Sequence, residues 1–167
     1  MDYLPVRIIV DGYNLIRCSP SLREREREGL EEGREALLEE LARYRRLKGH
    51  EITVVFDGMG NPHLGTRAYT ERGIRVIFTG SSRADDWIKK EVRRGKRVVV
   101  VTSDREIREH VERAGSVAIG SGEFEEIMMR AFLREVKGEE EGRPEKRGPA
   151  RRLPKRKRER ERVLAKL

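Results

Sequence analysis

Four short runs rich in β-branched and aromatic residues constrain this chain more than any other feature. Three of them are nearly continuous in Val, Ile and Phe, which is typical of strands covered on both faces, as in a parallel sheet. A further segment over residues 117–119 is expected to add an edge strand. The four runs are Val6–Val10, Ile52–Phe56, Ile74–Phe78 and Val98–Thr102.

Between these runs the apolar residues change to a helical spacing. Leu30, Leu37, Leu41 and Tyr44 recur seven, four and three residues apart, which predicts a long helix that ends near Gly49. Similar stripes predict three later helices, around residues 84–92, 107–114 and 124–132. Strands that alternate with helices indicate an α/β sandwich with right-handed crossovers and a central, mainly parallel sheet.

Positive charge is concentrated at the end of the chain. Residues 137–167 hold 13 Lys and Arg and 6 Glu, a net charge of +7, whereas the whole chain carries +8. The sequence therefore predicts a folded domain over 1–136 and a basic arm over 137–167 that is disordered or only conditionally helical. Such an arm attracts polyanions by counterion release, and RNA is the expected partner. It has few bulky apolar residues to insert into a membrane.

Cysteine usage and hydropathy bear on the compartment. Cys18 is the single cysteine, so no internal disulfide can form. No apolar run approaches the roughly 20 residues that span a bilayer. We therefore expect a soluble, cytoplasmic protein.

Acidic residues follow the predicted strands or open the next helix. Asp11 and Asp57 each come directly after a strand, and Asp104 follows a third strand after Ser103. The pair Asp85 and Asp86 begins the helix around residues 84–92. Because parallel strands end at the same edge of a sheet, these carboxylates are expected to lie together.

Each aspartate also has an ordinary explanation. Asp85 or Asp86 suits the positive end of a helix dipole, and capping a helix explains Asp104 equally well. Taken together, crowded carboxylates repel one another and favour a cation. Oxygen ligands suit Mg²⁺ or Mn²⁺, and the three histidines and Cys18 lack the spacing of zinc ligands.

Other aspartate-based classes fit the sequence poorly. Asp11 is followed by Gly12 and Tyr13, without the second acid that a haloacid dehalogenase-type phosphatase needs. There is no Walker A loop and no strand-linked GxGxxG. A metal site combined with an arm that attracts phosphate backbones points to a nuclease.

Four motifs in register resemble the NYN domains, a branch of the PIN-like nucleases. They are Ile9-Val-Asp-Gly-Tyr-Asn-Leu-Ile16, Val55-Phe-Asp57, Ala84-Asp-Asp-Trp-Ile88 and Val101-Thr-Ser-Asp104. Within that group the chain looks most like the bacterial YacP-like proteins, which are ribosome-associated endoribonucleases. The resemblance covers residues 6–136 and implies a PIN-like three-layer α/β/α sandwich.

The resemblance also implies roles for individual residues. Asp11, Asp85 and Asp104 would form the metal site for Mg²⁺ or Mn²⁺, and Asn14 would hold the acids or a substrate phosphate. Asp86 is expected to act beside them, although YacP-like proteins often carry serine at that position. Three further residues are expected to contact substrate, namely Tyr13, Arg83 and Ser103.

Some roles stay open at this point. Asp57 either belongs to the site or braces the following loop, and Thr102 and Ser103 either touch phosphate or satisfy backbone groups. Arg67 and Arg72 are candidates to line an RNA path. The leading hypothesis is hydrolysis of RNA at one or two Mg²⁺ or Mn²⁺ ions, with the arm on RNA or ribosome. The alternatives are an RNA- or ribosome-binding module without activity and a structure-specific DNA nuclease.

Overall fold

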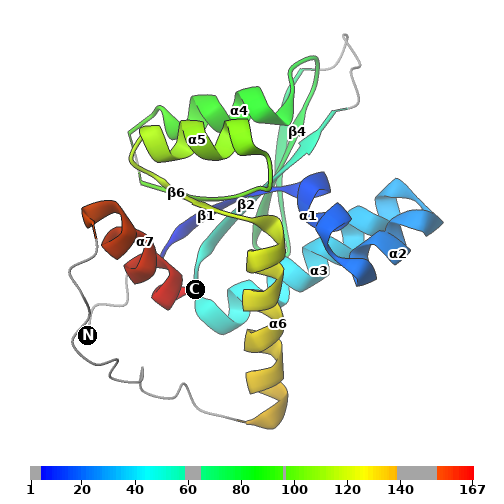
Figure 1. Ribbon diagram of the computed structural model, residues 1–167. Helices are drawn as coiled ribbons and strands as arrows, with labels where there is room; N and C mark the ends of the chain where they lie inside the picture. Colours follow the sequence, from blue (N-terminus) through cyan, green and yellow to red (C-terminus); the bar gives the residue numbers. More distant parts are fainter. Residues whose placement is uncertain (1–4, 59–64, 96, 139–153) are drawn as a thin grey trace.

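A six-stranded sheet forms the centre of the molecule (Figure 1). The computed structural model describes residues 5–58, 65–95, 97–138 and 154–167. The strand order is β3-β4-β2-β1-β5-β6, with β3 antiparallel and the other strands parallel. The strands are β1 (Arg7–Asp11), β2 (Glu51–Asp57), β3 (Arg67–Glu71), β4 (Ile74–Thr79), β5 (Val99–Val101) and β6 (Val117–Ile119).

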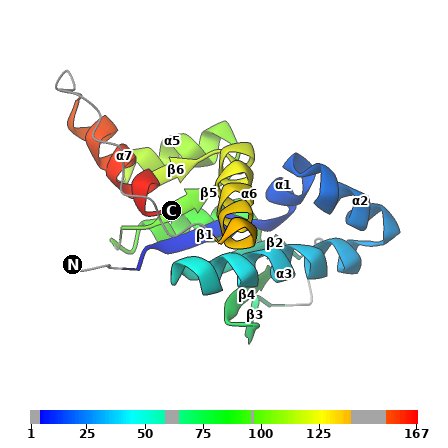
Figure 2. The same ribbon diagram turned by 90° about the horizontal axis from the view of Figure 1, so that it is seen from below.

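Helices cover both faces of this sheet, which confirms the predicted α/β/α sandwich with a mainly parallel sheet. Figures 1 and 2 show α4 and α5 on one face and α1, α3 and α6 on the other. The helices are α1 (Gly12–Cys18), α2 (Pro20–Glu28), α3 (Leu30–Lys48), α4 (Ala84–Val92), α5 (Arg105–Arg113), α6 (Ser121–Lys137) and α7 (Lys155–Lys166). Within the described residues no helix is long and apolar enough to cross a membrane.

Alternation along β1 explains the two cores. Ile8 and Val10 are fully buried against the α1, α3 and α6 layer, while Ile9 is buried against α4 and α5. Successive side chains of a strand point to opposite faces, so a run without polar residues needs cover on both sides. Burying each such side chain contributes roughly 1.5–3 kcal/mol, which makes this central strand a main source of stability.

The predicted strands and the long helix are confirmed, and α3 ends at Gly49 in a left-handed conformation with φ 74°. Strand β3 was not predicted, because its side chains are mostly exposed and lack an apolar run. It pairs with β4 through a tight turn in which Arg72 and Gly73 have φ of 52° and 79°. Pairing with β4, and not an intrinsic preference, therefore creates this edge strand.

Helices α1 and α2 fill the segment between β1 and α3. Ser19 caps α2 by accepting a hydrogen bond from the Leu22 backbone N–H at 3.4 Å, and Pro20 occupies its first position. Within α2, Arg25 forms an ion pair with Glu28, three residues later, at 3.2 Å. The exposed, charged character of α2 hid its boundaries from the sequence pattern.

The last residues of the chain form a helix, one of the two states expected for the basic arm. Helix α7 packs on the body, where Leu167 is buried and Val163 and Leu164 join the larger core. The Tyr44 hydroxyl donates to the Leu167 carbonyl at 2.7 Å, and His50 Nε2 lies 2.9 Å from the Lys166 carbonyl. Residues 155–167 therefore pack with the domain, whereas residues 139–153, predicted to be disordered, lie outside the described part.

Candidate active site

The helical connections change sides of the sheet between β1 and β5. The two strands are parallel neighbours, but α1 leaves β1 toward one face and α5 leaves β5 toward the other. Connections that diverge in this way mark the place, at the carboxyl ends of the strands, where α/β proteins usually bind their ligands. Asp11 ends β1 at this place, and Asp104 directly precedes α5, which follows β5.

Asp11 carries the clearest electrostatic signature of the site. Burial raises the pKa of its carboxyl group to about 6, against the lowering effect of a hydrogen bond from Thr102. The charges of Asp85, Asp104 and Asp57 raise this pKa further. Among the described residues no Lys or Arg forms an ion pair with Asp11. The fold thus places a carboxylate where a negative charge is poorly compensated.

Thr102 connects two of the acids. Its hydroxyl donates to Asp11 Oδ2 at 3.0 Å and accepts from the Asp104 backbone N–H at 3.2 Å. Thr102 is fully buried, so its hydroxyl group bonds with protein groups and not with solvent. Of the two options left open for Thr102, the structure therefore supports the one in which it satisfies protein groups.

Asp104 caps helix α5. Its Oδ1 accepts a hydrogen bond from the Ile107 backbone N–H at 3.1 Å. This is the ordinary role that the sequence left open, and it engages one of the two carboxyl oxygens. Asp104 also lies near enough to raise the pKa of both Asp11 and Asp85. The cap fixes the position of a charge that belongs to the acidic group.

Asn14 and Ser103 form a polar network behind the acids. Asn14 Oδ1 accepts from the Ser103 backbone N–H at 2.9 Å and from the Ser121 hydroxyl at 2.5 Å. The Ser103 hydroxyl accepts from the Ser121 backbone N–H at 3.3 Å and contacts Cys18 Sγ at 3.6 Å. These bonds hold the loop before Asp104 against the start of α6.

Four of the acidic positions are linked by the effects of their charges on the pKa of Asp11 and Asp85. Burial raises the pKa of Asp85, and the charges of Asp104 and Asp57 raise it further. Asp86 is exposed and is not among the charges that shift Asp11 or Asp85. Asp57, whose role the sequence left open, belongs to this group of charges. We call Asp11, Asp57, Asp85 and Asp104 the acidic group.

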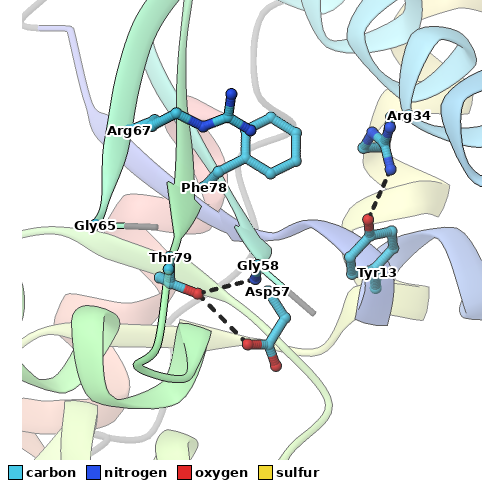
Figure 3. A pocket seen from close by; sticks show the side chains of 9 residues that line it. Tyr13, Arg34, Asp57, Gly58, Gly65, Arg67, Phe78 and Thr79 are labelled. Carbon is cyan, nitrogen blue, oxygen red and sulfur yellow. Dashed lines mark hydrogen bonds between the residues drawn. The ribbon is translucent and has the colours of Figure 1, made fainter. Parts of the chain in front are cut away.

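Two hollows adjoin the acidic group, and Tyr13 and Asp57 line both. The smaller one, of about 170 Å³, is also lined by Arg34, Arg67 and Phe78 (Figure 3). The larger one, of about 500 Å³, is lined in addition by Arg17, Leu30, Ser81, Ser82 and Arg83. Tyr13 and Arg83, both expected to contact substrate, therefore lie on the rim beside the acids.

Sequence reasoning missed Arg34, and it named Arg67 only as a candidate to line an RNA path. Arg34 lies on α3, and its guanidinium donates to the Tyr13 hydroxyl at 2.9 Å. No pattern along α3 marks this residue, because it reaches the rim from a helix that packs on one face of the sheet. Arg72, a candidate for the RNA path, instead pairs with Glu35 and Glu39 on α3.

The donor set suits a hard divalent cation by its chemistry. It consists of carboxylate oxygens whose negative charge is poorly compensated, and Mg²⁺ and Mn²⁺ prefer such oxygen ligands. As the side chains stand, however, no three Asp, Glu, His or Cys groups in the described ranges lie close enough to hold a metal ion. The residues therefore fit such an ion in kind, and side-chain rotation would have to draw them together.

Comparison with known proteins finds relatives of this chain. A curated relative, the uncharacterized protein YacP of Bacillus subtilis (strain 168), is 34% identical over 87 residues, which is 50% of this chain and 49% of that protein. The match thus spans about half the length of the relative.

Two crystal structures of Rae1 (YacP) from Bacillus subtilis share the fold. A mutant form gives a TM-score of 0.65 at 25% identity, covering 80% of this chain and 85% of that one. Another gives 0.61 at 27% identity, covering 81% of each. The family model for the YacP-like NYN domain matches residues 8–165, which include most of α7. The chain therefore belongs to the YacP-like NYN domain family.

Proposed function

We propose that this protein is a metal-dependent endoribonuclease that hydrolyses phosphodiester bonds of RNA at the acidic group. The observation that carries the proposal is the buried, poorly compensated Asp11 beside Asp85 and Asp104 at the carboxyl ends of parallel strands. A structural site would pair or cap such a charge, whereas a catalytic metal site leaves it available. Membership of the NYN family supports the same reading.

Asp11, Asp85 and Asp104 would hold Mg²⁺ or Mn²⁺, with Asp86 at the edge. When bound, the ion would supply Lewis-acid stabilisation of the phosphate and an activated water. Thr102 keeps the Asp11 carboxylate oriented through its 3.0 Å hydrogen bond.

Neighbouring side chains would handle the substrate. Asn14 keeps the loop before Asp104 in place through its bond to the Ser103 backbone. Arg83 and Tyr13, on the wall of the larger hollow, would bind the phosphate backbone and a base. Ser103, which is exposed, would contact a phosphate at the edge of the site.

The basic arm would supply affinity for RNA or for ribosomal RNA. On α7 the side chains of Lys155, Arg156, Lys157 and Arg158 are exposed. Phosphate contacts of this kind give binding without sequence preference, and they weaken as salt rises. We place this activity in the cytoplasm, with messenger RNA on the ribosome as the substrate.

Cleavage of RNA by the full chain in Mn²⁺ or Mg²⁺ tests the proposal. Wild type should cut a single-stranded RNA, and Asp11→Asn should lose activity by at least about 100-fold, since it weakens the metal site. Glu112→Gln, an exposed change on α5, is the matched control and should retain full activity. Equal rates for wild type and Asp11→Asn would refute the proposal, and DNA of the same sequence tests for a DNA nuclease.

One observation favours a second candidate, an RNA- or ribosome-binding module without catalysis. No three metal-binding side chains are close enough in the described residues to hold an ion as they stand. RNA binding that persists in EDTA, together with no cleavage in any divalent metal, would support this module. Binding that needs Mg²⁺ or Mn²⁺ would count against it.

A further inference from the structure

The smaller hollow beside the acidic group combines an aromatic ring with two guanidinium groups. Arg34 and Arg67 lie over the Phe78 ring, with their central carbons 5.4 and 5.7 Å from its centroid. Figure 3 shows Arg67 and Phe78 facing Arg34 and Tyr13 across the opening, with Asp57 below them. We call the residues Tyr13, Arg34, Arg67 and Phe78 the Phe78 pocket.

The aromatic side of this pocket is built into the sheet. Phe78 on β4 stacks on Phe56 of β2, with centroids 5.4 Å apart and the planes at 30°. Tyr69 on β3 lies nearly parallel to Phe78, at 16° and 6.2 Å. Tyr69 is 45% exposed, and Phe78 is half-buried. Rings held by neighbouring strands form a fixed platform on which a planar group can stack.

The two arginines are available to an anion. Neither Arg34 nor Arg67 forms an ion pair with an acidic side chain in the part of the chain that the structure describes. Arg34 uses one guanidinium N–H on the Tyr13 hydroxyl, at 2.9 Å, which fixes its direction and leaves other donors. A guanidinium group with free donors above an aromatic ring suits a phosphate next to a planar base.

The pocket adjoins the acidic group directly. Asp57 lines it, and the Asp57 side chain accepts a hydrogen bond from the Thr79 hydroxyl at 3.4 Å. Tyr13 lies two residues after Asp11. A volume of about 170 Å³ suits one planar base and not a base pair. A chain seated here would continue onto the acids within a nucleotide or two.

We propose that the Phe78 pocket binds one unpaired nucleotide of the RNA, next to the bond that is cut. Its base enters the hollow beside Phe78 and stacks on the guanidinium planes that lie over that ring. Its phosphate pairs with the remaining donors of Arg67 and Arg34. This inference rests on the proposed function and narrows the substrate, because only single-stranded RNA offers a free base face at that position.

An abasic scan tests the pocket. Fluorescein-labelled single-stranded RNAs, each lacking one base at a successive position around the mapped cut, are titrated with full-length Asp11→Asn by anisotropy. One position beside the cut should bind about tenfold more weakly than the intact RNA, the range of a single lost stacking contact. In Asp11→Asn combined with Phe78→Leu, the RNA that lacks a base at that position should bind as tightly as the intact RNA.

A second comparison avoids any effect on the core. Arg67→Gln changes an exposed residue and should weaken binding several-fold, with a salt slope reduced by about one. Arg75→Gln is the matched control. Arg75 is an exposed arginine on β4 that lies opposite Thr53 of β2 and Thr70 of β3 in the sheet, away from the pocket. This substitution should leave binding unchanged.

A flat abasic scan would overturn the inference, as would equal weakening by Arg67→Gln and Arg75→Gln or equal binding of fully double-stranded RNA. Failure of the proposed function is separable, because it appears as no cleavage by wild type. In that case no cut can be mapped, so the abasic position is moved along the whole RNA, and the anisotropy scan with Asp11→Asn still reports whether one base position depends on Phe78.

Discussion

The two ends of the sheet differ in how well their polar and charged groups are paired. At the carboxyl end the acidic group gathers like charges, and burial raises the pKa of Asp11 to about 6. At the amino end α7 is held by satisfied bonds, such as Tyr44 to the Leu167 carbonyl. His50 there has both ring nitrogens engaged, with Nδ1 accepting from the Val6 backbone N–H at 3.1 Å. The comparison indicates that one end is arranged for a ligand and the other for stability.

The largest expected effect separates activity from stability at the carboxyl end. Asp11→Asn should lose at least about 100-fold in cleavage rate. Its free energy of unfolding at pH 8 should nevertheless rise by about 1–3 kcal/mol, since the change removes a buried charge that has no ion-pair partner among the described residues. The Thr102 hydroxyl can still donate to the new amide oxygen. Urea unfolding beside a cleavage assay checks both. A variant that loses stability and activity together would contradict the comparison.

The two ends should also respond to pH in opposite directions. Asp11 has a folded pKa raised from 3.8 to about 6, so its carboxyl reduces stability increasingly as pH rises through that window. His50 has a folded pKa below 6.5, because burial disfavours its charged form. Its contribution is therefore present above about pH 6.5 and is lost as pH falls through the folded pKa.

Unfolding free energies at pH 4 and 7 check these signs. The stability gained in Asp11→Asn relative to wild type should grow from pH 4 to 7 by about 1–3 kcal/mol. The stability lost in His50→Gln should shrink as the pH falls below 6.5. The same trend for both variants would remove the contrast between the two ends.

Tyr44→Phe tests the amino end alone. It removes the buried hydrogen bond to the Leu167 carbonyl and should cost about 1–2 kcal/mol of folding free energy. The cleavage rate under folded conditions should stay the same, because Tyr44 lies at the other end of the sheet. A fall in cleavage rate without a fall in stability would show that the two ends are coupled.

The smallest effect is expected for Asp86→Asn. Asp86 is exposed, and its charge is not among the causes that account for the raised pKa of Asp11 and Asp85. Cleavage should therefore change by less than about threefold, as for a typical surface substitution. A loss comparable to that of Asp11→Asn, measured in the same assay, would place Asp86 in the metal site after all.

Local patterns account for the parts of the fold that were predicted. Continuous Val and Ile runs such as Val98–Thr102 require cover on both faces wherever they lie, so the parallel core was predictable. Strand β3 and helix α2 were not, because their exposed residues carry no apolar period. The packing of α7 was hidden for a similar reason, since its sequence is dominated by charge and only its last residues are apolar.

The candidate site divides along the same line. The positions of Asp11, Asp57 and Asp104 after strands could be seen in the sequence, because a parallel strand always delivers its last residue to the same edge. The exposure of Asp86 next to the partly buried Asp85 could not, since neighbouring residues on a helix point in different directions. Arg34 was also invisible, because its place beside Tyr13 depends on how α3 packs across the sheet.

The sequence by itself determined a parallel α/β core, an acidic edge and a basic end, because burial and strand polarity act through local residue order. Only the tertiary structure decided which acids influence one another's pKa, which arginines line the hollows beside them and where α7 packs. Those outcomes depend on distances between segments far apart in the chain, which no local pattern encodes.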